Sequence, residues 1–355
     1  MKPLVVLTRS HRVESIHSGA ICISDYHNQL QSRIGNEQKK IYLRSSAKPF
    51  QAVALAASGS LEKFGISLEE LSVICSSHSG EDFHRQAVYS ILQKIGLTEE
   101  DLDCGICNPY NPEMLTRITC KQEKPSQLFN CCSGKHAGML ALCRFYGYPT
   151  KGYVEKTHPV QQLILNTIAS LLNIPSEEIV TGQDGCGVPN FMISLQQAAY
   201  LYALLAAGEK GHSQYGFVLS KIANAMLAYP RMINGDSEFC TELINYSGRK
   251  VIGKVGGEGV YCLAIPEKGL GAAVKIADGN ERAVYPVALH ILRQLGLTDR
   301  EMEDRLVLWA FPPIKDHRGN IIGYTLPVFD VLQGTNEAIK IGDNFVFKGE
   351  CLWKH

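Results

Sequence analysis

Strand-like segments at both ends of the chain enclose a long helical middle, and this order limits the folds available to it. Apolar residues recur at helical spacing through most of the middle. The simplest arrangement pairs the terminal strands in one antiparallel sheet. The expected strands are residues 3–9, 19–25, 39–43, 250–255, 259–264 and 270–276.

We therefore predict an α/β fold of the α+β type, with an antiparallel sheet, flanking helices and a helical lobe. Residues 1–355 are expected to form a single domain. Its sheet lobe would contain residues 1–58 and 245–355, and its helical lobe residues 59–244. A cleft between two lobes is a favoured place for a small-molecule site.

Composition argues against nucleic-acid and membrane partners. The formal net charge is zero, and no basic stripe offers itself to phosphates. No apolar run approaches the roughly 18 residues that a membrane span needs. The apolar residues 3–7 are too few for a signal peptide, so we expect a cytoplasmic protein. Disulfides are then not expected, and several of the 12 cysteines are expected to be small buried thiols: Cys22, Cys75, Cys143, Cys240 and Cys262.

Three local predictions bear on the architecture around the site. Residues 73–75 are expected to form a buried strand that ends just before Ser76. Residues 190–207 are expected to form one amphipathic helix. The tail, residues 299–355, is expected to contain strands at 321–324 and 344–347.

The first chemical motif is an S-x-x-K stretch, with Ser45 and Lys48 three residues apart at the expected start of a helix. A serine hydroxyl needs a base to become a nucleophile. Lysine can be that base if burial or nearby positive charge lowers its pKa from about 10.4 toward 7. The alternative is an ordinary helix start, because serine is a good N-cap.

Two later segments carry similar residues. Ser77 opens a run of small polar residues that ends at Glu81, just before a helix expected from Asp82. Lys254 precedes the glycine-rich residues 255–259 at the end of a strand, where glycines permit close approach of a ligand. The alternatives are a loop with an N-cap and a bulged hairpin with a solvated lysine.

These signals follow the order found in serine penicillin-recognising enzymes. In those enzymes an S-x-x-K motif is followed by a second serine and then by a lysine and glycine on a strand. Here the corresponding residues are Ser45 with Lys48, then Ser77, then Lys254. Their coincidence in the right order makes a shared cleft the best interpretation.

A group of cysteines suggests a metal. Cys132, Lys135 and His136 begin a predicted helix, and Cys186 lies in a glycine-dense loop. Zinc accepts thiolate and imidazole ligands. Two distant cysteines lack the paired spacing of structural zinc sites, so two buried thiols remain the alternative. The C-x-x-C at residues 104–107 has no matching second pair and is interpreted as two thiols in a loop.

At these motifs the sequence resembles the bacterial L-asparaginase II family of the Rhizobium etli type. The resemblance extends over essentially the whole chain. It departs from the family pattern at Cys107, where a histidine is often found, so no role for that loop follows. The motifs that carry it are residues 44–48, 77–81, 132–138, 184–187 and 254–259.

The resemblance implies a zinc-containing homodimeric enzyme with a β-lactamase/penicillin-binding-protein-like fold. Its activity would be hydrolysis of the L-asparagine side-chain amide to L-aspartate and ammonia. The implied site residues are Ser45 paired with Lys48 and Ser77 paired with Lys254 for catalysis, Cys132, Lys135 and Cys186 for Zn²⁺, and Arg44, His136, Asp184 and Glu258 for the substrate.

As a mechanism we expect Ser45 to attack the amide with neutral Lys48 as its base, while Ser77 and Lys254 supply a proton to the departing ammonia. Either serine is a candidate nucleophile, because each has a lysine assigned to it. Zinc would act on the substrate or a water, or through its charge alone. Two alternatives stay open. One is a glutaminase, esterase or β-lactamase of the same fold, and the other is a non-enzymatic dimeric amino-acid or metal-binding protein.

Overall fold

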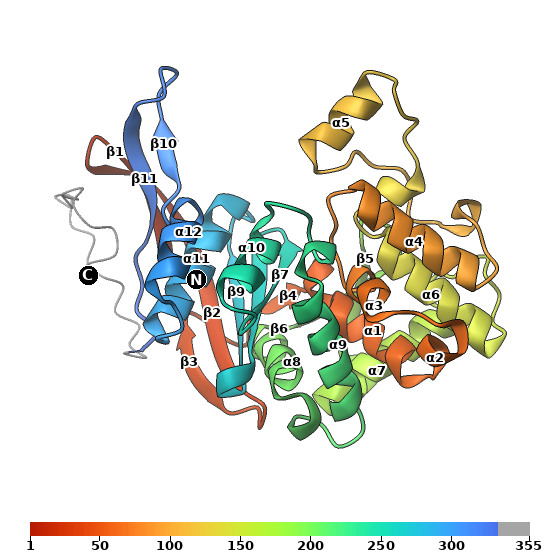
Figure 1. Cartoon of the computed structure of the whole chain (residues 1–355). Helices are drawn as coiled ribbons and strands as arrows, with labels where there is room; N and C mark the ends of the chain where they lie inside the picture. Colours follow the sequence, from red (N-terminus) through yellow and green to blue (C-terminus); the bar gives the residue numbers. More distant parts are fainter. Residues whose placement is uncertain (333–355) are drawn as a thin grey trace.

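An eight-stranded antiparallel sheet joins the two ends of the chain in the computed structural model, which describes residues 1–332 (Figure 1). Strands from the N- and C-terminal parts of the chain pair in this sheet, as the sequence predicts, and the N-terminal strands lie between the C-terminal ones. The order is β10(Pro313–Lys315), β11(Ile321–Pro327), β1(Lys2–Arg9), β2(Arg12–Asp25), β9(Leu270–Ile276), β8(Val260–Ile265) and β7(Ile252–Gly257), with β3(Leu30–Ile34) also paired to β2.

Helices cover both faces of this sheet. Successive side chains of a strand point to opposite faces. On one face, the Tyr261 ring packs against two helices, α10(Phe239–Tyr246) and α11(Val284–Gln294). Its centroid lies 5.5 Å from that of Phe239 and 6.0 Å from that of Tyr285. On the other face, the backbone of α8(Leu195–Ala207) passes so close to Gly271 that a β-carbon there would clash with it.

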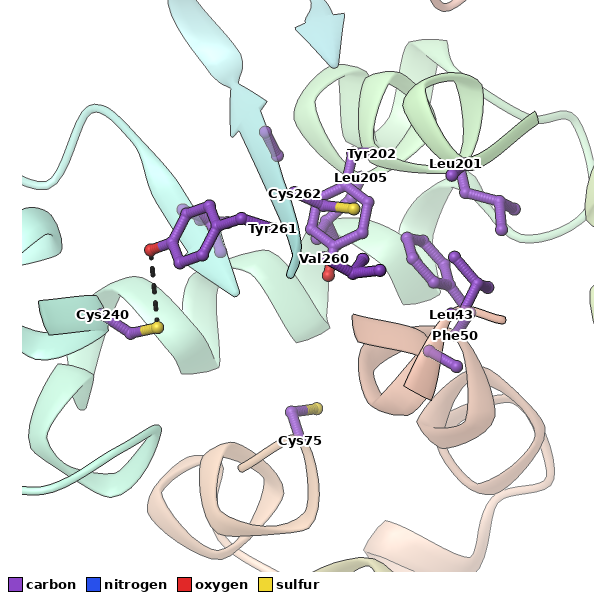
Figure 2. Close-up of a cluster of buried hydrophobic side chains, with 14 of the residues drawn as sticks. Leu43, Phe50, Cys75, Leu201, Tyr202, Leu205, Cys240, Val260, Tyr261 and Cys262 are labelled. Atoms are coloured by element: carbon purple, nitrogen blue, oxygen red, sulfur yellow. Dashed lines mark hydrogen bonds between the residues drawn. The ribbon is translucent and has the colours of Figure 1, made fainter. Parts of the chain in front are cut away.

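The buried core continues from the sheet into the S-x-x-K segment (Figure 2). Phe50 and Tyr202 pack edge to face, with ring centroids 5.1 Å apart. The Tyr202 hydroxyl donates a hydrogen bond of 2.8 Å to the carbonyl oxygen of Ser46. Burying a side chain such as Phe50 contributes roughly 1.5–3 kcal/mol. The turn that carries Ser45 is therefore held against α8 by the core.

The remaining helices form a second body beside the sheet, and a small sheet joins the two (Figure 1). β6(Pro189–Ser194) lies at the centre of the small sheet, between β4(Lys40–Tyr42) and β5(Val180–Gln183). One short helix, α5, projects away from the other helices. The helices of this body are α1(Lys48–Ala57), α2(Ser60–Phe64), α3(Leu68–Ile74), α4(Asp82–Lys94), α5(Pro112–Thr119), α6(Ser133–Tyr146), α7(Pro159–Leu172) and α9(Gly216–Ala228).

Two local predictions were wrong, and the strands expected in the tail are confirmed in part. Val73 and Ile74 belong to helix α3, which begins with a capping box between Ser67 and Glu70 and is too short to reveal helical periodicity. Residues 190–207 divide at Ser194, the N-cap of α8, into a strand and a helix. In the tail, β11 confirms the strand expected at 321–324, but residues 300–310 form helix α12(Arg300–Ala310). The strand expected at 344–347 lies outside the described residues.

The two lobes expected from the sequence agree with the packing only in part. Helix α8 was assigned to the helical lobe but packs on β9 and β2 of the large sheet, and β4 pairs with a strand from the middle of the chain. Helix α1 was assigned to the sheet lobe but packs against α6, α7 and α9. Within residues 1–332, no helix is long and apolar enough to cross a bilayer.

Candidate active site

A cavity of about 400 Å³ brings together residues from all five motif segments. It lies where the turn before α1, the end of α3 and the end of β7 meet. The residues that line it are Arg44, Ser45, Ser77, Cys107, Tyr110, Asn130, Cys131, Cys132, Asp184, Gly185, Cys186, Asn234, Glu238, Val255, Gly256, Gly257, Glu281 and Tyr285.

Arg44 enters the site in a conformation that few residues other than glycine adopt, with φ of 53°. Its backbone N–H donates to the Asn190 side-chain oxygen at 2.9 Å. Its guanidinium Nε donates to Asp184 Oδ1 at 2.7 Å. These partners hold a strained backbone of the kind that often occurs at binding sites.

Ser77 is the centre of the polar network. Lys254 Nζ donates to Ser77 Oγ at 2.8 Å, and Lys48 Nζ donates to the same oxygen at 3.1 Å. The Ser77 backbone is also fixed, because its N–H donates to the carbonyl oxygen of Ile233 at 2.8 Å. Its carbonyl oxygen accepts from the Asn234 side chain at 3.1 Å. One serine hydroxyl on the cavity wall thus contacts two lysine amines.

The two lysines are both buried but bonded differently. Lys48 Nζ donates to the carbonyl oxygens of Ser76 and Cys131 as well as to Ser77, which uses all three N–H groups of an ammonium. Lys254, which is 0% exposed, has a pKa lowered to about 7, first by burial and then by the charge of Lys48. Lys254 is therefore the lysine suited to take a proton near neutral pH.

This network changes the expected pairing of serines and lysines. The pair of Ser77 with Lys254 is present, as predicted. The hydrogen bond expected between Ser45 and Lys48 is not formed among the described residues, because the Lys48 amine extends to Ser77. Ser45 lies in the 3₁₀ turn Arg44–Ala47 and lines the same cavity.

A second wall of the cavity carries the predicted metal ligands. Lys135, in the first turn of α6, donates from Nζ to Cys186 Sγ at 2.9 Å. Hydrogen bonds from Cys131 and Cys186 hold the pKa of the Cys132 thiol well below its usual value. Burial opposes the charge on Lys135, but its sulfur neighbours and Asp184 outweigh burial and raise the pKa of its amine.

The donors on this wall fit a zinc ion in chemical type. Two thiols and an amine are within contact of one another, and zinc binds thiolate and nitrogen ligands. Within residues 1–332, no three His, Cys, Asp or Glu side chains gather as a metal site. Lys135 would therefore have to be a ligand in its neutral form, with the metal replacing its proton.

Two predicted substrate residues do not reach the cavity. His136 is fully buried, with its Nδ1 at 2.7 Å from the Tyr153 hydroxyl. It follows Lys135 on α6, and neighbouring residues of a helix point in different directions. Glu258 is exposed in the turn between β7 and β8, with its carboxylate beside Gly279. By contrast, Arg44 and Asp184 line the cavity as predicted.

The sequence analysis missed a group of cavity residues between α9 and α11. Asn234 and Glu238 come from the irregular segment before α10, Glu281 from the 3₁₀ turn before α11, and Tyr285 from the first turn of α11. The sequence offers one signal, the glycine at position 235. In the structure Gly235 has φ of 129°, and a β-carbon there would clash with Ser79 and Glu81. A glycine at such a position indicates close packing against the Ser77–Glu81 run.

Comparison with known proteins finds one family. The family model described as L-asparaginase II matches residues 5–327, which is most of the chain. No curated protein matches the chain.

Several solved structures are similar at low identity. One is described as Mglu in its native form, with 11% identity, a TM-score of 0.44 and coverage of 79% of this chain, which spans 65% of that protein. Another is a putative beta-lactamase from Bacteroides dorei, with 11% identity, a TM-score of 0.44 and coverage of 78% of this chain and 93% of the other. A beta-lactamase from Mycobacterium bovis has 13% identity, a TM-score of 0.41 and coverage of 82% and 95%. The fold class itself rests on the sheet and helices described above, which match the predicted α/β architecture.

Proposed function

The chain belongs to the L-asparaginase II family, and from this premise we propose that it hydrolyses the side-chain amide of L-asparagine to L-aspartate and ammonia. Family membership supports an amidohydrolase. The observation that carries the mechanism is the convergence of Lys48 and Lys254 on the Ser77 hydroxyl at the cavity wall.

In the proposed reaction Ser77 is the nucleophile and Lys254 the base. Ser77 Oγ forms a bond to the amide carbon while its proton passes to the neutral Lys254 amine. The protonated Lys254 then returns that proton to the nitrogen, and the C–N bond breaks to release ammonia. Water attacks the resulting aspartyl ester, with Lys254 accepting a proton from it. As the C–O bond to Ser77 breaks, Lys254 returns that proton to the serine oxygen, which regenerates the enzyme.

The other residues of the cavity position and stabilise these groups. Lys48 donates to the serine oxygen and favours the negative charge that develops on it. Arg44 carries a guanidinium at the cavity wall that suits the α-carboxylate of an amino acid. When bound, a zinc ion held by Cys132, Lys135 and Cys186 would supply a Lewis acid beside the substrate.

The first test is ammonia release from L-asparagine and from L-glutamine, with a no-substrate control and with zinc content measured on the same sample. Release from asparagine supports the proposal. Release from glutamine alone, or turnover of esters or β-lactams instead, would select another hydrolase. Asparagine binding without ammonia would select a non-enzymatic protein.

The nucleophile is tested with Ser77→Ala and with Ser45→Ala as the matched variant on the same wall. We expect Ser77→Ala to lower kcat by at least about 10³-fold. Ser45→Ala should still form the aspartyl ester on Ser77, which peptide mass spectrometry of acid-quenched reactions would detect. An ester on Ser45 in the wild-type protein would restore the assignment expected from the sequence. Melting curves of both variants check that the fold is kept.

We also propose a homodimer located in the cytoplasm. Sedimentation equilibrium of the purified protein tests the dimer, and fractionation of the source cells tests the location.

A further inference from the structure

One part of the cavity wall carries two carboxylates, those of Glu238 and Glu281. Glu238 lies immediately before α10, and Glu281 begins the 3₁₀ turn Glu281–Ala283 that leads into α11. Both line the cavity that Ser77 faces. Tyr285 lines it beside them, and both carboxylates contribute to raising the pKa of its hydroxyl. The cavity therefore has an acidic wall made by the starts of two helices.

The carboxylates of this wall disfavour one another. Glu238 is half-buried, and burial together with the charges of Glu81 and Glu281 raises its pKa. A cation bound here would relieve the repulsion, and its attraction to Glu238 would be strengthened by partial burial.

A neighbouring group independently offers a hydrogen-bond acceptor to the cavity. Asn234 is 8% exposed and lines the cavity, with its side-chain nitrogen committed to the Ser77 carbonyl oxygen at 3.1 Å. Among the described residues, no donor bonds to its side-chain oxygen. Because the same amide holds the Ser77 backbone, a ligand group that donates to Asn234 would lie next to the nucleophile.

We infer that Glu238, with Glu281 and the side-chain oxygen of Asn234, binds the α-ammonium group of a free α-amino acid substrate. This inference rests on the proposed function, since it assigns the part of the cavity that recognises the amino group of asparagine. An ammonium group offers three N–H donors and a positive charge, which match two carboxylates and one amide oxygen. Arg44 supplies the opposite charge for the α-carboxylate.

The inference makes the enzyme selective for free amino acids. A ligand without the α-amino group leaves the Glu238 carboxylate without a cationic partner. A ligand whose amino group is acylated has no positive charge to offer to that carboxylate. Hydrogen bonds to charged groups are worth enough to change kcat/KM by about 10–100-fold. The relevant comparison is therefore L-asparagine with succinamate, which differs from it by the missing amino group.

The test measures kcat/KM for L-asparagine and for succinamate in wild type, Glu238→Gln and Glu242→Gln. Glu242 is the matched control, because it is a half-buried carboxylate four residues further along, on α10, and does not line the cavity. We expect the ratio of the two kcat/KM values to favour asparagine in wild type and to fall about 10–100-fold in Glu238→Gln. Glu242→Gln should keep the wild-type ratio.

The inference would be overturned if Glu238→Gln lowered kcat/KM equally for L-asparagine and for succinamate. It would also be overturned if wild type had nearly the same kcat/KM for the two substrates. A binding arm keeps this result separate from the proposed reaction. L-Aspartate and succinate are titrated calorimetrically into the same three proteins. If wild type releases no ammonia, the proposed function fails. The ammonium site is still supported if wild type binds L-aspartate more tightly than succinate and Glu238→Gln abolishes that difference. Equal binding of aspartate and succinate by wild type would contradict it.

Discussion

Lys254 and Lys135 are buried beside the same cavity, yet their pKa values move in opposite directions. Lys254 faces a neutral serine hydroxyl and a second lysine, so burial and like charge lower its pKa to about 7. Lys135 faces Cys132, Cys186 and Asp184, which raise its pKa in spite of similar burial. The neighbours of a buried lysine, more than its burial, decide which chemistry it can perform.

The difference divides the cavity into two functional walls. The Lys254 wall is suited to proton transfer, because its amine can be neutral at the pH of the cell. The Lys135 wall pairs an ammonium with sulfur, and a zinc ion bound there would take the place of one of its protons. Each of the following predictions tests one wall or the contrast between them.

The largest effect is expected at Lys254. Replacing it with methionine removes the proposed base, and kcat should fall by about 10²–10⁴-fold, the range for general acid–base catalysis. Lys254→Arg is the informative partner, because arginine keeps the charge but cannot lose its proton near neutral pH. We expect it to be nearly as inactive. Full activity of Lys254→Arg, measured by ammonia release, would show that charge alone matters at this position.

The fold was predictable where a segment's own residues determine its structure. The terminal strands and the start of α1, with Pro49 in its first turn, are local signals, and the structure confirms them. Val73 and Ile74 were misassigned because a short apolar run fits a buried strand and a buried helix equally well. Only the packing of α3 between other helices distinguishes the two.

The site was predictable in its residues but not in their contacts. Ser77 and Lys254 stand out by their sequence context, and their hydrogen bond confirms that they meet. The bond from Lys48 to Ser77 depends on the direction that a long side chain takes across the core, which spacing along the chain does not specify. Glu238 lies in a segment with no motif, so only the fold brings it to the cavity.

The next effect concerns the metal on the Lys135 wall. If zinc is bound by two thiolates and an amine, replacing Cys186 with serine should lower zinc affinity by at least about 10–100-fold. Metal content after dialysis against a chelator series measures this directly. Cys143→Ser, at a buried cysteine of the same helix as Lys135 that does not line the cavity, is the control. Equal zinc content in both variants would exclude this ligand set.

The pH dependence should show about a tenfold change. Lys254 must be neutral to accept a proton, so kcat/KM should rise with pH, with a midpoint near 7 and about a tenfold increase between pH 6 and 8. The same shift affects stability. The unfolded lysine binds a proton up to about pH 10.4, so this group makes the fold more stable as pH rises from about 7 to that value. Lys254→Met should lose this contribution in denaturant titrations, and an unchanged slope would contradict the lowered pKa.

The smallest effect is expected at Glu258, which tests whether the contrast between the walls is confined to the cavity. Glu258 follows Lys254 by four residues, but its carboxylate lies in an exposed turn beside Gly279 and outside the cavity. Glutamine has nearly the same size as glutamate. Both residues carry a β-carbon, so Glu258→Gln adds no backbone strain at the φ of 51°. We expect kcat/KM for L-asparagine to stay within about twofold of wild type, as for most exposed substitutions, whose cost is within about 0.5 kcal/mol. A tenfold loss with an unchanged melting temperature would place this carboxylate in contact with the substrate, as the family resemblance first implied, and would mean that the turn between β7 and β8 closes over the cavity when substrate binds.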